Sequence, residues 1–168
     1  MRLGEEYPQW DRIQIVLIGS FLVAMIFDKW SLVSFGYSSI LDRLLHLPEL
    51  LAAAIFLFVS GIYLLKKSHD AVFGRVGTPE LLDSGVYSLV RHPMYLGGLM
   101  IMLSFLLLNL SIIALVIWAA YALLCDWMAT YEEKDLARKV GKEYEGYREI
   151  VPKWLPRLSR KSKMNKRG

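Results

Sequence analysis

Residues 95–124 read YLGGLMIMLSFLLLNLSIIALVIWAAYALL, thirty residues without one charged side chain. A helix needs about 20 apolar residues to cross the hydrocarbon core of a bilayer. The run is therefore too long for one ordinary span and rather short for two full ones. Asn109-Leu110-Ser111 interrupts it near its middle. This pattern predicts a tight helical hairpin with arms near 95–108 and 112–128, and one long tilted helix is the alternative.

Two further apolar runs precede the hairpin. Residues 13–27 read IQIVLIGSFLVAMIF, and the second run covers 47–65. The hydrophobic fraction of the chain, 55%, exceeds the roughly 45–50% of soluble domains. The four apolar segments predict an all-α, polytopic integral membrane protein with about four transmembrane helices. The length of 168 residues favours a single domain over 1–168.

Basic residues are distributed unevenly between the two sides of this four-span topology. One side carries eighteen Lys and Arg residues, in 1–12, in the 66–94 loop and in the tail from 125 onward, whereas the other side carries only Lys29 and Arg43. Cytoplasmic loops of membrane proteins are enriched in Lys and Arg. We therefore expect both termini and the 66–94 loop to be cytoplasmic.

The tail after the last apolar run has a helical pattern over 127–150. Apolar and aromatic residues with one carboxylate form a stripe within about 60° at the helical period, namely Glu133, Leu136, Val140, Tyr144 and Tyr147. This predicts a C-terminal cytoplasmic helix that ends before Pro152. Residues 157–168 are basic and lack apolar periodicity. We expect a disordered tail that either is attracted to anionic headgroups or only keeps the terminus soluble.

Several site types are disfavoured by composition. The chain has one cysteine, Cys125, and three histidines without a metal-ligand spacing, so the sequence predicts neither an intrachain disulfide nor a metal site. The net charge of +4 is explained better by the positive-inside rule than by nucleic-acid binding.

Polar residues gather where the hairpin arms should meet the cytoplasmic surface. Pro93 suits the first turn of a helix, which places His92 at the N-cap. The helix N-terminus and Arg91 then offer positive charge for a carboxylate or phosphate. Glu132 and Glu133, on the facing segment, offer negative charge for a cation. The hairpin would bring these two segments together.

Aromatic residues near the same segments can hold a soft cation; these are Tyr95, Trp127, Tyr131, Tyr144 and Tyr147. S-adenosylmethionine combines a carboxylate, an ammonium, a sulfonium and an adenine, and so matches the whole set. A phospholipid headgroup fits many of the same contacts. The aromatic residues are also typical of an interfacial belt, and Arg91 and His92 of a positive-inside anchor. The Glu132-Glu133 pair is also typical of a solvated helix face, and Gly97 and Gly98 of close helix packing.

Two motifs in these segments resemble a known family. The first is Gly85-x-Tyr87-x-x-x-Arg91-His92-Pro93-x-Tyr95-x-Gly97, and the second is Glu132-Glu133-x-x-Leu136 followed by Gly141-x-x-Tyr144-x-x-Tyr147, Val151 and Pro156. Together, over 78–156, they resemble the signatures of the integral membrane methyltransferases related to isoprenylcysteine carboxyl methyltransferase and the phospholipid methyltransferases.

The resemblance implies an all-helical membrane enzyme whose S-adenosylmethionine pocket lies at the cytoplasmic end of the hairpin, and no Gly-x-Gly-x-x-Gly motif is present. It assigns the cofactor pocket to Tyr87, His92, Tyr95, Gly97, Glu132, Glu133, Tyr144 and Tyr147, together with Arg91. The implied substrate is a membrane-embedded lipid-like molecule, such as an isoprenylcysteine-type carboxylate or a phospholipid amine. A carboxylate acceptor needs an orienting cation, for which Arg91 and Arg148 are the catalytic candidates.

Two other functions fit parts of the sequence. NADPH-dependent membrane reductases of the sterol reductase type also carry His-Pro-x-Tyr-x-Gly. They typically have Asn where this chain has Met94, and an acidic residue where it has Gly98. A non-enzymatic scaffold or transport subunit is the third possibility, although the span interiors lack the ionisable residues that transport favours.

Overall fold

The computed structural model describes residues 8–35, 47–74, 81–109 and 111–156, and the described chain is helical without strands. The predicted all-α class is therefore confirmed. The elements are α1 (Pro8–Phe35), α3 (Leu47–Phe73), the 3-10 helix η1 (Gly85–Ser88), α4 (Pro93–Asn109), α5 (Ile112–Val140) and α6 (Lys142–Ile150). The basic tail predicted for 157–168 lies outside the described residues.

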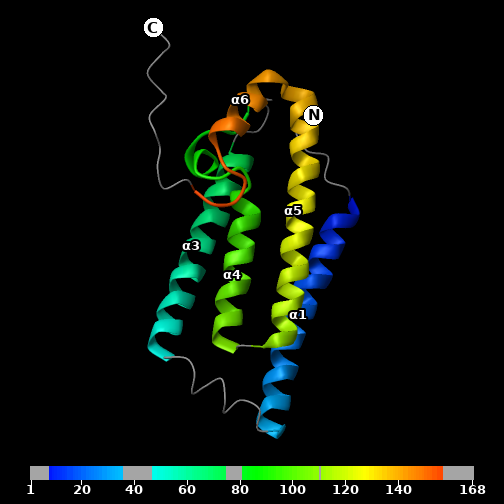
Figure 1. Ribbon diagram of the computed structural model, residues 1–168, viewed down its shortest axis with the longest axis vertical. Coiled ribbons are helices and arrows are strands. Elements are labelled where there is room, and N and C mark those ends of the chain that lie inside the picture. Colours follow the sequence, from blue (N-terminus) through cyan, green and yellow to red (C-terminus); the bar gives the residue numbers. More distant parts are fainter. Residues whose placement is uncertain (1–7, 36–46, 75–80, 110, 157–168) are drawn as a thin grey trace.

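Four of these helices form an elongated bundle in which the chain alternates in direction (Figure 1). Helices α1 and α4 run down in this view, and α3 and α5 run up. The most extensive contacts are between α3 and α4, followed by those between α1 and α5. As a result, η1, the start of α4, the end of α5 and α6 all gather at the upper end of the bundle.

The turn between α4 and α5 has the predicted hairpin geometry. Helix α4 ends at Asn109 and α5 begins at Ile112. Ser111 caps α5, because its side chain accepts a hydrogen bond from the Ala114 backbone N–H at 3.1 Å, as Ser residues at helix N-termini commonly do. The Asn109 side chain donates to the Met25 carbonyl at 2.8 Å and ties the turn to α1. The alternative of one long helix is wrong.

A close crossing of two glycines explains the tight packing of α3 against α4. A Cβ atom at Gly97 would lie 2.8 Å from the Gly61 carbonyl oxygen, and a Cβ at Gly61 would lie 2.8 Å from the Gly97 carbonyl oxygen. Backbone oxygens cannot move aside as a flexible side chain can. Both positions therefore need glycine for the helices to approach this closely, as small residues allow in membrane bundles.

The predicted continuous helix over 127–150 is wrong. Helix α5 ends at Val140, and α6 restarts at Lys142 after Gly141, whose φ is 67° and ψ is −131°. Glycine adopts positive φ without the steric penalty of a Cβ atom, so the chain can turn here. The turn folds α6 over the end of the bundle (Figure 1), and Tyr144 and Glu133 are both buried.

Two helices are long and apolar enough to cross a membrane, over Pro48–Phe73 and Ile112–Val140. Only 11% and 28% of their most apolar windows are buried inside the protein, so most of this apolar surface faces outward. Arg12–Phe27 and Pro93–Asn109 are shorter apolar helices. Four membrane spans with cytoplasmic termini remain a prediction.

Candidate functional site

The upper end of the bundle brings the two predicted motifs into contact. Pro93 is the first residue of α4, and the preceding His92 carbonyl accepts a hydrogen bond from the Leu96 N–H at 3.1 Å. His92 therefore lies at the N-cap, as predicted. The Arg91 backbone N–H donates to the Pro152 carbonyl at 3.0 Å, which fixes the entry to α4 against the chain that follows α6.

A buried ionic cluster forms around Glu133 of α5. Its Oε1 accepts from Arg91 Nε at 3.0 Å and from Arg91 Nη2 at 2.9 Å, and lies 3.0 Å from His92 Nε2. Arg91 Nη1 also donates to the carbonyls of Arg148 and Val151, each at 3.0 Å. All three guanidinium nitrogens are thus engaged, and they join the start of α4 to α5 and to the end of α6.

The adjacent Glu132 has a different environment. One of its oxygens accepts a hydrogen bond from the Tyr95 hydroxyl, and the other lies 3.6 Å from His92 Nδ1. Its side chain is 28% exposed, whereas that of Glu133 is 8% exposed. Glu132 is therefore the carboxylate of this pair that a ligand can reach.

The two carboxylates control the charge of His92. Burial disfavours the charged form, but hydrogen bonds and attraction from Glu132 and Glu133 outweigh burial, so the pKa of His92 is raised above its ordinary value. Each ring nitrogen faces a different carboxylate. The two carboxylates therefore favour protonation of the ring, whose Nε2 lies within hydrogen-bond distance of Glu133.

The tyrosines of α6 serve different purposes. Tyr144 is 1% exposed, and its hydroxyl has no hydrogen-bond partner among the residues that the structure describes. Burial raises the pKa of Tyr144 to about 12, so this hydroxyl remains a neutral donor. The Tyr147 hydroxyl instead donates to the Tyr87 carbonyl at 2.7 Å and fastens α6 to η1. Burial likewise raises the pKa of Tyr87 to about 12.

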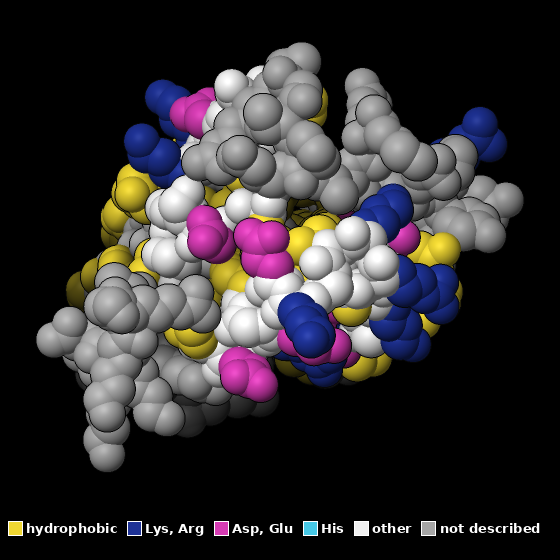
Figure 2. All heavy atoms as spheres, turned by 90° about the horizontal axis from the view of Figure 1, so that it is seen from above, with side chains coloured by type: hydrophobic (Ala, Val, Ile, Leu, Met, Phe, Trp, Pro, Cys, Tyr) yellow, Lys and Arg dark blue, Asp and Glu magenta, His cyan; other side chains and the backbone are white. Residues whose placement is uncertain are grey.

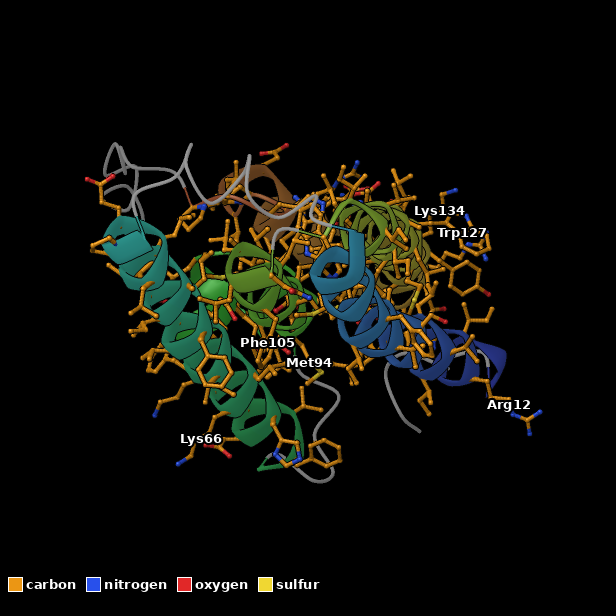
Figure 3. The ribbon with its side chains drawn as sticks, turned by 90° about the horizontal axis from the view of Figure 1, so that it is seen from below. Arg12, Lys66, Met94, Phe105, Trp127 and Lys134 are labelled. Atoms are coloured by element: carbon orange, nitrogen blue, oxygen red, sulfur yellow. The ribbon has the colours of Figure 1, made fainter. Side chains whose placement is uncertain are left out.

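The remaining predicted residues lie around this cluster. Gly97 packs against α3, as described above, rather than facing Glu132 or Glu133 in the described contacts. The Arg148 side chain is exposed on α6, and its backbone carbonyl receives Arg91. Trp127 projects outward from α5 together with Lys134 (Figure 3), and its side chain is 55% exposed.

Sequence reasoning missed the segment that follows α6. The Trp154 ring lies 5.9 Å from the His92 ring, and its Nε1 donates to Asp126 Oδ1 at 2.8 Å. Lys153 Nζ bridges Asp126 Oδ1 at 2.6 Å and Thr130 Oγ1 at 2.8 Å. The segment folds back because of these tertiary contacts. An aromatic residue between Pro152 and Pro156, beyond the end of the helix, was the available signal.

Charged side chains of both signs collect on this end of the molecule. Seen from above, some Asp and Glu side chains lie near the centre of the face and others at its edges, and several Lys and Arg side chains lie on the right with others at the upper left (Figure 2). Within the described residues, no group of three or more His, Cys, Asp or Glu side chains could hold a metal ion.

Known proteins are similar to this chain over the segments that supply the cluster. The family model described as phospholipid methyltransferase matches residues 48–143, which include both Arg91–Tyr95 and Glu132–Glu133. The chain is 23% identical to the methanethiol S-methyltransferase of Crocosphaera subtropica over 167 residues, which cover 90% of this chain and 63% of that protein. The chain thus spans less than two thirds of the length of this relative. No solved structure matches.

Proposed function

Because this chain belongs to the phospholipid methyltransferase family, we propose that it transfers a methyl group from S-adenosylmethionine to a membrane-partitioned acceptor. The observation that carries the proposal is the cluster in which Arg91 and His92, at the start of α4, meet Glu132 and Glu133 of α5. Two distant parts of the sequence supply it, and both lie within the residues matched by the family.

The residues at this end of the bundle fit such a cofactor. Glu132 is a partly exposed carboxylate that suits the ammonium or sulfonium of the ligand. Tyr144 offers a buried hydroxyl that has no partner among the described residues, and an unsatisfied buried hydroxyl is costly unless a ligand or water completes it. When bound, S-adenosylmethionine supplies an electrophilic methyl group on a positively charged sulfur.

We assign separate roles to the charged residues. All three guanidinium nitrogens of Arg91 are already engaged, so Arg91 acts by positioning Glu133 and the chain after α6. Arg148 is exposed and is the better candidate to orient an anionic acceptor. The two ring nitrogens of His92 already face the two carboxylates, so a proton lost by an amine or thiol acceptor would go to the partly exposed Glu132 carboxylate.

The acceptor is proposed to be apolar and to arrive from the bilayer. The outward apolar surface of α3 and α5, together with the family, indicates a membrane location. An acceptor dissolved in the bilayer could reach the end of the bundle without entering water. The family name suggests a phospholipid amine, the motif resemblance suggests an isoprenylcysteine-type carboxylate, and the named relative suggests a small thiol.

A transfer assay tests the proposal. Reconstituted protein is incubated with S-adenosylmethionine labelled on the transferred methyl group and with total membrane extract, and the products are partitioned between organic solvent and water. We expect protein-dependent label in the organic phase. Label only in water-soluble, non-lipidated products would contradict the membrane-partitioned acceptor, and absence of any transferred label would contradict methyl transfer. Tyr144→Phe is expected to weaken cofactor binding, and Tyr63→Phe, on the exposed surface of α3, is its control.

A further inference from the structure

An apolar cavity of about 270 Å³ lies between α4 and α5, next to the ionic cluster. Its walls include Leu96, Leu99, Met100 and Leu103 of α4, Trp118 of α5, and Trp154. None of the described residues that line it is charged. Typical pockets for drug-sized ligands measure roughly 300–1,000 Å³, so the cavity suits a small apolar group.

Both indole N–H groups in the cavity wall are already used. Trp118 Nε1 donates to the Leu99 carbonyl at 3.0 Å, and Trp154 Nε1 donates to Asp126 Oδ1 at 2.8 Å. A molecule bound in the cavity would therefore make apolar contacts, and neither indole N–H would be available to donate a hydrogen bond to it. A phosphate or carboxylate would lose its hydration here without a partner, which is strongly unfavourable. A neutral alkyl group has no such desolvation penalty and is stabilised by the burial of its apolar surface.

Trp154 joins the cavity to the ionic cluster. It lines the cavity, and its ring also lies 5.9 Å from that of His92. The Asp126 carboxylate holds the indole, and Lys153 holds Asp126 in turn and lies 5.7 Å from the indole ring centre. A single fixed side chain thus stands between the apolar space and the polar residues proposed to hold the cofactor.

We infer that this cavity receives the apolar part of the methyl acceptor and that Trp154, at its polar end, limits the bulk that it accepts next to the reactive head. The inference rests on the proposed methyl transfer. The charged or reactive head of the acceptor would lie toward His92 and Glu132, and its alkyl chain toward Leu103. Asp126 is a positioning residue, because it acts through Trp154.

Two variants change the cavity in opposite directions. Trp154→Ala removes the bulky side chain at the polar end of the cavity. Leu103→Phe places a larger side chain in the cavity and reduces its volume. Trp154→Phe is the conservative variant, because it keeps an aromatic side chain in the wall. Phe56→Ala is the control, because Phe56 lies on α3 and is 69% exposed. If Trp154→Ala does not fold, Leu103→Phe still tests whether the cavity holds the alkyl chain, and Trp154→Phe still tests the indole.

The first readout is the preference of the full-length reconstituted protein among alkyl thiols, amines and carboxylic acids, both straight-chain from methyl to dodecyl and branched at the carbon next to the reactive group. We expect Trp154→Ala to raise the ratio of branched to straight-chain transfer by about tenfold, the scale on which pockets discriminate alkyl groups. Leu103→Phe should lower the ratio of long-chain to short-chain transfer, Trp154→Phe should change the branched ratio less than Trp154→Ala does, and Phe56→Ala should keep the original profile. An active Trp154→Ala with an unchanged profile overturns the inference and leaves methyl transfer standing.

The second readout does not depend on turnover. A short alkyl probe that carries a diazirine is photolysed with the protein, and the labelled peptides are identified by mass spectrometry. We expect label on 96–103 that an unlabelled acceptor displaces. Label that no acceptor displaces would indicate a lipid chain in the cavity and overturn the inference. Wild-type protein that transfers no labelled methyl group to any acceptor would instead overturn the proposed function itself.

Discussion

At the scale of single residues, the neighbours Glu132 and Glu133 are chemically identical but structurally distinct. Glu133 is buried and accepts from both Arg91 and His92. Glu132 is more exposed and contacts Tyr95 and the other His92 nitrogen. The difference follows from their places on α5, because adjacent helical residues point about 100° apart. Glu133 consequently stabilises the site, and Glu132 remains available to a ligand.

Amide substitutions should separate these two roles. We expect Glu133→Gln to lower the free energy of unfolding by about 2–3 kcal/mol, because it leaves a buried guanidinium without its counter-charge. Glu132→Gln should change stability little but weaken S-adenosylhomocysteine binding by about 1–3 kcal/mol. Thermal unfolding in detergent and calorimetry measure the two effects, with Glu143→Gln on the exposed face of α6 as control. Equal behaviour of the two variants would refute the division of roles.

The charge of His92 should make stability depend on pH. Its pKa is raised in the folded protein, so its contribution is fully present below the unfolded pKa of about 6.5 and is lost as the pH rises through the folded pKa. The wild type should therefore exceed His92→Gln in thermal stability by the largest margin below a pH of about 6.5, and this margin should shrink at higher pH. An advantage that grows with pH would show that His92 is held neutral.

At the scale of elements, the α3–α4 crossing makes a sharp prediction about two adjacent glycines. Gly97→Ala should destabilise the protein by about 1–3 kcal/mol, the usual cost of overpacking, because its Cβ would meet the Gly61 carbonyl oxygen at 2.8 Å. Gly98→Ala is the matched control, since the nearest atom to its Cβ is the Tyr121 hydroxyl at 3.8 Å. Thermal unfolding of both variants checks this, and equal stability would contradict the close crossing.

The same variants test how Gly97 relates to the cofactor. The motif resemblance placed Gly97 in the cofactor pocket, whereas the structure gives it a packing contact with Gly61. We expect any loss of S-adenosylhomocysteine binding in Gly97→Ala to be proportional to the fraction of protein that is no longer folded. A folded, fully stable Gly97→Ala that no longer binds the ligand would instead support direct contact.

Local sequence signals predicted some elements well and others poorly. The hairpin was predictable because Asn109 and Ser111 interrupt an uncharged run at a length that one span cannot accommodate. The break at Gly141 was not, because the stripe from Glu133 to Tyr147 keeps the helical period and an isolated glycine is tolerated in helices. The return of Trp154 depends on contacts with Asp126, 28 residues earlier, which no local periodicity encodes.

At the scale of the whole molecule, the alternating bundle puts every proposed site residue at one end. The start of α4, the end of α5 and α6 meet there, and the α4–α5 turn lies at the opposite end (Figure 1). Most Lys and Arg residues fall in sequence segments that connect to the end of the bundle with the proposed site. The positive-inside rule therefore predicts that the site faces the cytoplasm.

Cysteine labelling in intact cells tests this orientation. In a background with the buried Cys125 replaced by alanine, Glu143→Cys should react with a membrane-impermeant thiol reagent only after the membrane is permeabilised. Asn109→Cys, at the α4–α5 turn, should be accessible from outside. Labelling of position 143 in intact cells would place the site on the other side of the membrane.

The central claim is that the cluster around Glu132 and His92 holds S-adenosylmethionine, and direct titration tests it. The purified, full-length protein in detergent is titrated calorimetrically with S-adenosylhomocysteine and, separately, with NADPH. We predict saturable binding of S-adenosylhomocysteine that Glu132→Gln weakens and Glu143→Gln does not, and no binding of NADPH. Binding of NADPH, or the absence of S-adenosylhomocysteine binding by protein that still unfolds cooperatively on heating, would contradict the account.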